Sequence, residues 1–162
     1  MASWNDVSLA APEFAAVVRA IFDAHKHKTL ATLRKDGSPR ISGIEADFVD
    51  EDLWLGAMWQ SQKALDLRRD PRFALHSATA DADADAAWRG DAKIAGRAEE
   101  VTDQEHKRSV QAASGGEAPP GPNHLFRAEV SEAVLIRVGD PPDHLVIESW
   151  HEGRGLRRVE RR

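Results

Sequence analysis

Three short β-suited runs follow one another in the first part of the chain, and they constrain the fold more than any other feature. They cover residues 29–34, 40–49 and 53–59. The first gap contains Asp36 and Gly37, a pair that supplies the positive φ of a tight hairpin turn, and the second gap is the acidic triplet 50–52. The three runs therefore predict an antiparallel meander.

Further short helices and strands are predicted along the rest of the chain. The expected helices cover 9–24, 61–69 and 102–113, and the expected strands cover 72–77, 91–101, 125–130, 133–138 and 144–150. The first helix follows Ser8 and has apolar residues at three- and four-residue spacing. Pro71 ends the second helix, and Thr102 with Glu105 forms a capping box for the third. Many short strands and only three helices predict a mainly β protein with peripheral helices, an antiparallel Greek-key-like barrel.

The length of 162 residues fits one domain, which we expect to span residues 1–162. Four segments differ in composition from the expected barrel strands: the N-terminal helical segment 1–27, an acidic loop at 78–90, a Gly/Pro loop at 114–124 and an Arg-rich tail at 153–162. The acidic loop consists mainly of Ala, Asp and Thr, which is typical of an exposed loop. The Gly/Pro loop is long enough for a lid or an insertion.

Composition excludes several classes of protein. Lys and Arg number 22 against 27 Asp and Glu, which gives a net charge of −5 and lacks the basic excess of a nucleic-acid binder. The absence of cysteine excludes disulfides, thiolate zinc sites and a cysteine nucleophile. The N-terminus lacks the features of an export signal, and no apolar run approaches the roughly 18 residues of a membrane span. We therefore expect a cytoplasmic protein with no nucleic-acid or membrane partner.

The tripeptide Ser61-Gln62-Lys63 directly follows an expected strand and opens an expected helix. The first turn of a helix has unsatisfied backbone N–H groups and the positive end of the helix dipole. Together with the Ser61 hydroxyl and the Lys63 ammonium, these groups suit the binding of a phosphate. The alternative is purely structural, because serine is a common helix N-cap. Both interpretations are open from the pattern alone.

Several other side chains are weaker candidates for a site. Trp54 and Trp59 lie at odd spacing on one expected strand, so they face opposite sides and one of them belongs to the core. His76, His124 and His151 are possible haem ligands, although a single neutral histidine more often has a structural role. The arginines of the tail are open to three interpretations: a solvated end, a nucleic-acid arm or a clamp for a cofactor phosphate. We expect no metal site.

Several motifs, taken in order, resemble the pyridoxamine 5′-phosphate oxidase-like flavin-binding split-barrel family. The motifs are the hairpin 31–40, the block 53–56 leading to 61–64, the segment 67–72, the segment 96–99 and Trp150 with the arginines behind it. The resemblance runs over most of the chain. It is closer to the small relatives that bind FMN, the deazaflavin F420 or haem than to the oxidase itself.

The resemblance implies a homodimer with FMN in the groove between two barrels. Ser61, Gln62 and Lys63 match the family's phosphate-contacting segment, with Gln62 in place of an arginine. Trp150 matches a tryptophan near the isoalloxazine, and Arg157 or Arg161 matches the arginines that follow it. The remaining matched positions depart from the family's residue types. Ser42 and Asp47 stand where a phosphate-binding arginine and lysine are usual. Gly56 and Ala57 stand where an aromatic residue and a threonine usually face the flavin.

The implied function is that of an FMN-binding oxidoreductase acting on an unidentified small organic substrate. An F420-dependent reductase is one alternative, and a non-catalytic flavin- or haem-binding module is another. A dimeric scaffold with a decayed site is a third. The redox chemistry of a flavin belongs to its ring, so the implied function requires no catalytic triad, and we assign no catalytic residue.

Overall fold

The computed structural model describes residues 1–79, 89–115 and 119–162. The expected acidic loop 78–90 therefore lies largely outside the described residues, whereas the Gly/Pro loop 114–124 is outside them only at 116–118 and ends in the first residues of β6. The helices are α1 (Trp4–Ala10), α2 (Pro12–Asp23), α3 (Gln62–Arg69) and α4 (Gln104–Ala113). The strands are β1 (His27–Leu33), β2 (Pro39–Val49), β3 (Asp52–Met58), β4 (Arg72–His76), β5 (Asp91–Glu100), β6 (Asn123–Val138), β7 (Leu145–His151) and β8 (Gly155–Arg161).

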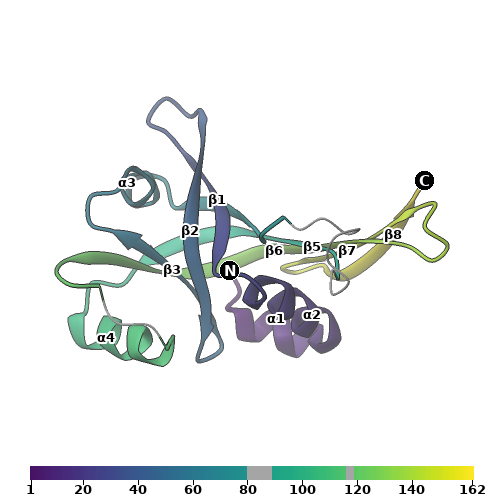
Figure 1. Ribbon diagram of the computed structural model, residues 1–162, viewed down its shortest axis with the longest axis horizontal. Helices are drawn as coiled ribbons and strands as arrows, with labels where there is room; N and C mark the ends of the chain where they lie inside the picture. The colour runs from purple at the N-terminus through teal and green to yellow at the C-terminus, as the bar shows by residue number, and fades with distance from the viewer. Residues whose placement is uncertain (80–88, 116–118) are drawn as a thin grey trace.

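The strands form one antiparallel sheet that closes on itself, which confirms the predicted fold class. The order is β3-β2-β1-β4-β5-β6-β7-β8, and an additional pairing of β3 with β6 closes the first six strands into a barrel. Strands β7 and β8 continue from β6 as an arm that projects away from the barrel, and α3 lies at the barrel's opposite end (Figure 1). None of the described helices has both the length and the apolar character that crossing a membrane requires.

One bulge allows β6 to belong both to the barrel and to the arm. Ala95 pairs with Glu132 and Gly96 pairs with Val130, so Ser131 has no partner residue on β5. Such an extra residue bends a strand and increases its twist. A Cβ on Gly96 would lie 1.8 Å from the carbonyl oxygen of Glu129, so this close approach requires glycine. The bulge replaces the expected gap between two separate strands at 125–130 and 133–138.

The predicted helices 9–24 and 102–113 differ from the observed ones at their starts and caps, and one strand was not predicted. The expected helix 9–24 is two helices, because Pro12 is tolerated only in the first turn and begins α2 after the non-helical Ala11. Ser3 rather than Ser8 is the cap, and it forms a capping box with Asp6 in α1. Asp103 rather than Thr102 caps α4, since its carboxylate accepts from the backbone N–H of His106 at 2.7 Å. Most of the Arg-rich tail forms strand β8, which was not predicted.

The core fills the barrel and the space between the barrel and the two N-terminal helices. Its largest fully buried side chains include Trp4, Phe22, Leu30, Leu55 and Phe126. A separate small cluster beneath α4 contains Val49, Trp54, Val110 and Leu125. Helix α3 lies at one end of the barrel (Figure 1) and contributes Ala64 and Leu67 to the core, while Gln62 in its first turn is exposed.

Replacement of Gly96 by alanine tests the role of the bulge. We expect Gly96→Ala to lower the free energy of unfolding by about 1–3 kcal/mol, because the added Cβ would collide with backbone that cannot move aside. Gly43→Ala is the matched control, since a Cβ there would have nothing within 4 Å. Urea denaturation of both variants measures the difference. Equal stability of the two variants would contradict the steric requirement.

Candidate functional site

The junction of β3 and α3 presents an unused hydroxyl at the start of a helix. Ser61 is the N-cap residue of α3, but its side chain makes no capping hydrogen bond. Its Oγ is buried and has no hydrogen-bond partner among the residues that the structure describes. The purely structural interpretation of Ser61 as a cap is therefore not what the structure shows. A helix start with unpaired N–H groups and a hydroxyl that lacks a partner is the kind of donor set that an anion requires.

Lys63 is the second residue of α3 and links that helix to β2. Its Nζ donates to the carbonyl oxygen of Gly43 at 2.5 Å, next to Ser42. Partial burial lowers the pKa of the Lys63 ammonium. Ser42 is half-buried and shares its face of β2 with Arg40, which contacts α3. The structure therefore brings Lys63, two residues after Ser61, against the backbone of β2 next to Ser42.

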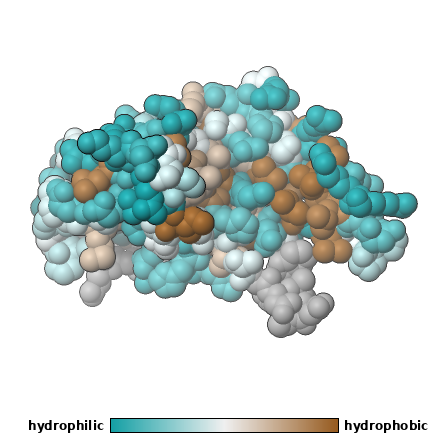
Figure 2. All heavy atoms as spheres, turned by 90° about the horizontal axis from the view of Figure 1, so that it is seen from above, coloured by the Kyte–Doolittle hydropathy of each residue, from teal (hydrophilic) through white to brown (hydrophobic). Residues whose placement is uncertain are grey.

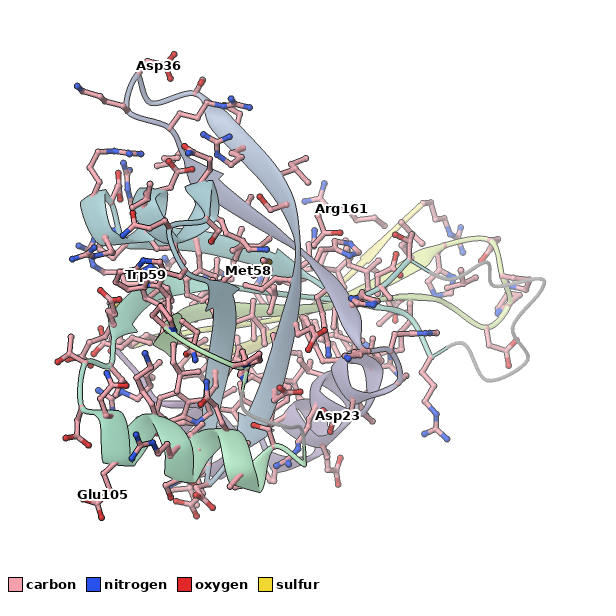
Figure 3. All side chains as sticks on the ribbon, turned by 60° about the vertical axis from the view of Figure 1, so that its left-hand side comes forward. Asp23, Asp36, Met58, Trp59, Glu105 and Arg161 are labelled. Carbon is pink, nitrogen blue, oxygen red and sulfur yellow. The ribbon has the colours of Figure 1, made fainter. Side chains whose placement is uncertain are left out.

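The outer face of β2 and β3 beside this junction lacks side chains at two positions, and the exposed Glu45 stands directly opposite Gly56. Gly43 and Gly56 are exposed, and a Cβ at either position would have nothing within 4 Å. Ile41 and Met58 border them with 75% and 79% of their surface exposed. Figure 3 shows Met58 and Trp59 at the end of β3, close to α3. Of the predicted pair on β3, Gly56 faces this surface, whereas Ala57 is buried on the other side.

A basic hollow of about 510 Å³ continues from this junction along α3. It is lined by Arg34, Lys35, Asp36, Arg40, Gln62, Asp66 and Arg69. Four cations against two acids make it locally basic in a chain whose net charge is −5. Gln62, predicted from the sequence, is one of its lining residues, whereas the arginines were missed. The signal that could have revealed them is Asp66, an acid at a buried position of an amphipathic helix.

Asp66 holds two of these arginines in place. Its carboxylate accepts from Thr32 Oγ1 at 2.9 Å, from Arg40 Nε at 2.7 Å and from an Arg69 guanidinium nitrogen at 3.0 Å. Burial raises the pKa of Asp66, but the hydrogen bonds from Arg40, Arg69 and Thr32 more than offset this, and the pKa lies below its usual value. The carboxylate is therefore ionised at neutral pH and orients the arginines around the hollow.

The predicted residues of the arm do not join this junction within one chain. Trp150 is only 4% exposed and belongs to the core. It pairs with Leu156, the residue before Arg157, so Arg157 and Arg161 lie on the opposite face of the arm. Both arginines are exposed and form no ion pair within the described residues. Figure 1 shows α3 and β8 at opposite ends of the molecule.

The histidines considered as haem ligands differ in their surroundings. Both ring nitrogens of His124 have partners, Nδ1 with Glu100 and Nε2 with the backbone N–H of Gln60. His76 Nδ1 lies 2.7 Å from the carbonyl oxygen of Ser77, and His151 Nε2 lies 3.6 Å from Glu132. The geometry of His124 therefore leaves no lone pair for an iron atom.

The closed barrel with a projecting arm, and an anion-suited helix start at the barrel's end, define a split-barrel protein with a candidate cofactor site. The sequence model of the family described as pyridoxamine 5′-phosphate oxidase matches residues 14–137, which is most of the chain. The chain belongs to this family. A search of curated proteins finds no match.

Solved structures with the same fold include proteins with different ligands. PhzG from Burkholderia lata 383, in complex with tetrahydrophenazine-1-carboxylic acid, is 16% identical with a TM-score of 0.61, over 96% of this chain and 91% of that one. A heme binding protein from Mycobacterium smegmatis is 15% identical with a TM-score of 0.57, over 90% and 86%. An F420 reductase is 15% identical with a TM-score of 0.53, over 71% and 94%. At these identities the likeness establishes the fold alone.

Replacement of Asp66 by asparagine tests whether this carboxylate organises the hollow. We expect Asp66→Asn to lower the free energy of unfolding by about 2 kcal/mol at neutral pH, because Arg40 and Arg69 lose a shared buried partner. Because the pKa of Asp66 is lower in the folded than in the unfolded protein, its ionised carboxylate stabilises the fold at pH values above the unfolded pKa. This stabilisation is lost as the pH falls through the folded pKa. Denaturant titrations should therefore show the difference shrinking below about pH 4.

The matched control for Asp66→Asn is Glu99→Gln, which removes an exposed acid paired with Arg127 at 2.7 Å. Exposed pairs contribute about 0–1 kcal/mol, so this variant should remain close to the parent protein. A pH-independent loss in Asp66→Asn, or an equal loss in both variants, would show that the charge of Asp66 does not organise the hollow.

Proposed function

We propose that this protein is a homodimeric flavin-binding oxidoreductase in which each cofactor lies between two barrels and acts on a small organic substrate. The observation that carries the proposal is the Ser61 hydroxyl, buried without a partner at an uncapped helix start. An N-terminal helix turn with a hydroxyl and a lysine matches the donors that a flavin phosphate needs. The donor set therefore fits the phosphate end of FMN.

The neighbouring surface fits the ring of the same cofactor. Gly43 and Gly56 leave the outside of β2 and β3 flat, while Ile41 and Met58 give it an apolar border. A flavin requires an apolar slot for its ring and supplies the hydride or electron transfer itself when bound. The residues of this chain would bind the phosphate, orient the ring and exclude water from one side of it.

A second copy of the chain is part of the proposal because one copy supplies only part of the site. Arg157 and Arg161 lie on the arm, away from their own α3 (Figure 1). The face that carries them also carries a row of paired apolar residues, Ile136, Ile147 and Val159. Figure 2 shows apolar residues gathered toward the arm end of the molecule. Packing of this face on another barrel would cover the apolar row and bring the arginines to the partner's cofactor.

An F420-type deazaflavin is the second candidate, and the basic hollow favours it. FMN carries a single phosphate, which the first turn of α3 and Lys63 already suit. F420 carries further carboxylates in its tail, and the hollow lined by Arg34, Lys35, Arg40 and Arg69 begins beside the same helix turn. Turnover assays with reduced cofactor distinguish an enzyme of either kind from a module that only binds.

Replacement of Lys63 by alanine tests the phosphate site. We expect roughly tenfold or greater weakening of FMN binding and little change for riboflavin, which lacks the phosphate, because a charge-assisted hydrogen bond is lost. Fluorescence titration with both flavins measures the difference. Lys26→Ala is the control, since Lys26 is exposed and paired with Glu45 at 3.2 Å. Equal weakening for both flavins would rule out a phosphate contact by Lys63.

The paired substitution Arg34→Ala and Lys35→Ala separates the two candidate cofactors. If the hollow holds an anionic tail, F420 binding should weaken roughly tenfold while FMN binding changes by less than about threefold. Titration of the purified protein with each cofactor provides the comparison. An equal effect on both cofactors would show that the hollow does not bind the F420 tail. If neither cofactor binds the protein, the flavin proposal is contradicted.

A further inference from the structure

His124 is buried beside the loop that connects β3 to α3, and it contacts that loop directly. Its side chain is 1% exposed. Nδ1 lies 2.6 Å from Glu100 Oε1 on β5, and Nε2 lies 3.3 Å from the backbone nitrogen of Gln60. Gln60 immediately precedes Ser61, the residue that opens the candidate phosphate site.

These two contacts determine the protonation of the ring. A backbone N–H can only donate, so Nε2 of His124 must accept from Gln60 and carries no hydrogen. The proton of the neutral ring is then on Nδ1 and is donated to the Glu100 carboxylate. This arrangement requires neutral His124, because the imidazolium form has a hydrogen on both nitrogens.

The loop that His124 contacts adopts a backbone conformation that needs support. Gln60 has a φ of 56°, in the left-handed region that non-glycine residues rarely occupy. Trp59 stacks on the His124 ring with centroids 4.7 Å apart and planes 9° from parallel. Phe126 lies on β6 with its ring centroid 6.1 Å from that of His124. The histidine therefore supports Trp59 by stacking and Gln60 by hydrogen bonding.

We propose that His124 is a positioning residue that holds the segment 59–61 in its phosphate-binding conformation only while its ring is neutral. Protonation would place an Nε2 hydrogen against the Gln60 N–H, and the loop would lose this bond. The inference rests on the proposed binding of a phosphorylated cofactor at Ser61. Its consequence is that affinity for this cofactor falls when the His124 ring becomes protonated.

Charged groups on three neighbouring elements surround this switch. Glu100 on β5 contacts the ring directly, and Arg68 on α3 pairs with the same carboxylate at 3.1 Å. Lys107 on α4 is buried, and its Nζ donates to the carbonyl oxygen of Asn123, the residue before His124. Protonation of the ring would keep the contact of Nδ1 with Glu100 on β5 and lose the contact of Nε2 with the loop.

The first experiment needs no cofactor. In ¹⁵N-labelled full-length protein, we expect the amide resonance of Gln60 to shift with pH and with the same midpoint as the His124 ring. Glu100→Gln keeps an acceptor for Nδ1 but removes the negative charge, so both midpoints should move to lower pH. A Gln60 resonance that does not follow His124, or midpoints unaffected by Glu100→Gln, would overturn the proposal.

The second experiment links the loop to the ligand. Between about pH 7.5 and pH 5.5, we expect the FMN affinity of the parent protein to fall by a factor roughly five times larger than the FMN affinity of His124→Gln. The amide of the variant does not titrate in this range. The same variant corrects for titration of the FMN phosphate itself. Identical pH profiles would overturn the positioning role. A titrating Gln60 in a protein that binds no FMN would instead contradict only the proposed function.

Discussion

The dual pairing of β6 is the constraint on which the other features of this molecule depend. Its first residues close the barrel by pairing with β3, and its last residues pair with β7 and carry the arm. The bulge at Ser131 allows one strand to do both, and it exists because Gly96 permits the backbone of β6 to come close. A regular β6 would extend the barrel sheet and leave no separate arm for a neighbouring molecule.

Closure of the barrel also determines where α3 can act. The helix is anchored at the barrel's end through Asp66, whose carboxylate accepts from Thr32 on β1 and Arg40 on β2. This anchor fixes the first turn of α3 beside the flat outer surface of β2 and β3. His124 stabilises the same junction from β6 through the loop before Ser61. The helix start is thus held by contacts to several strands rather than by its own cap.

The sequence predicted the elements whose signals are local. The Asp36-Gly37 turn produced the observed hairpin of β1 and β2, and Pro71 marked the end of α3. Strand β8 was missed because it lies at the sheet's edge with charged residues on both faces, and such a strand shows no hydrophobic alternation. The ion pair of Asp66 with Arg40 could not be predicted, since the two residues are 26 apart in the sequence and meet only through barrel closure, whereas Arg69 is three residues from Asp66 on the same helix.

The separation of the two cationic regions gives the proposed dimer its physical basis. The basic hollow lies at the α3 end of the barrel, and Arg157 and Arg161 lie on the arm at the other end. Within one chain the two cationic regions lie at opposite ends and therefore do not act on the same anion. A two-fold axis would place each arm beside the α3 of its partner, and the same contact would occur twice. One interface would then bury the apolar faces of both arms and complete two anion sites, so dimer stability and cofactor affinity would be linked.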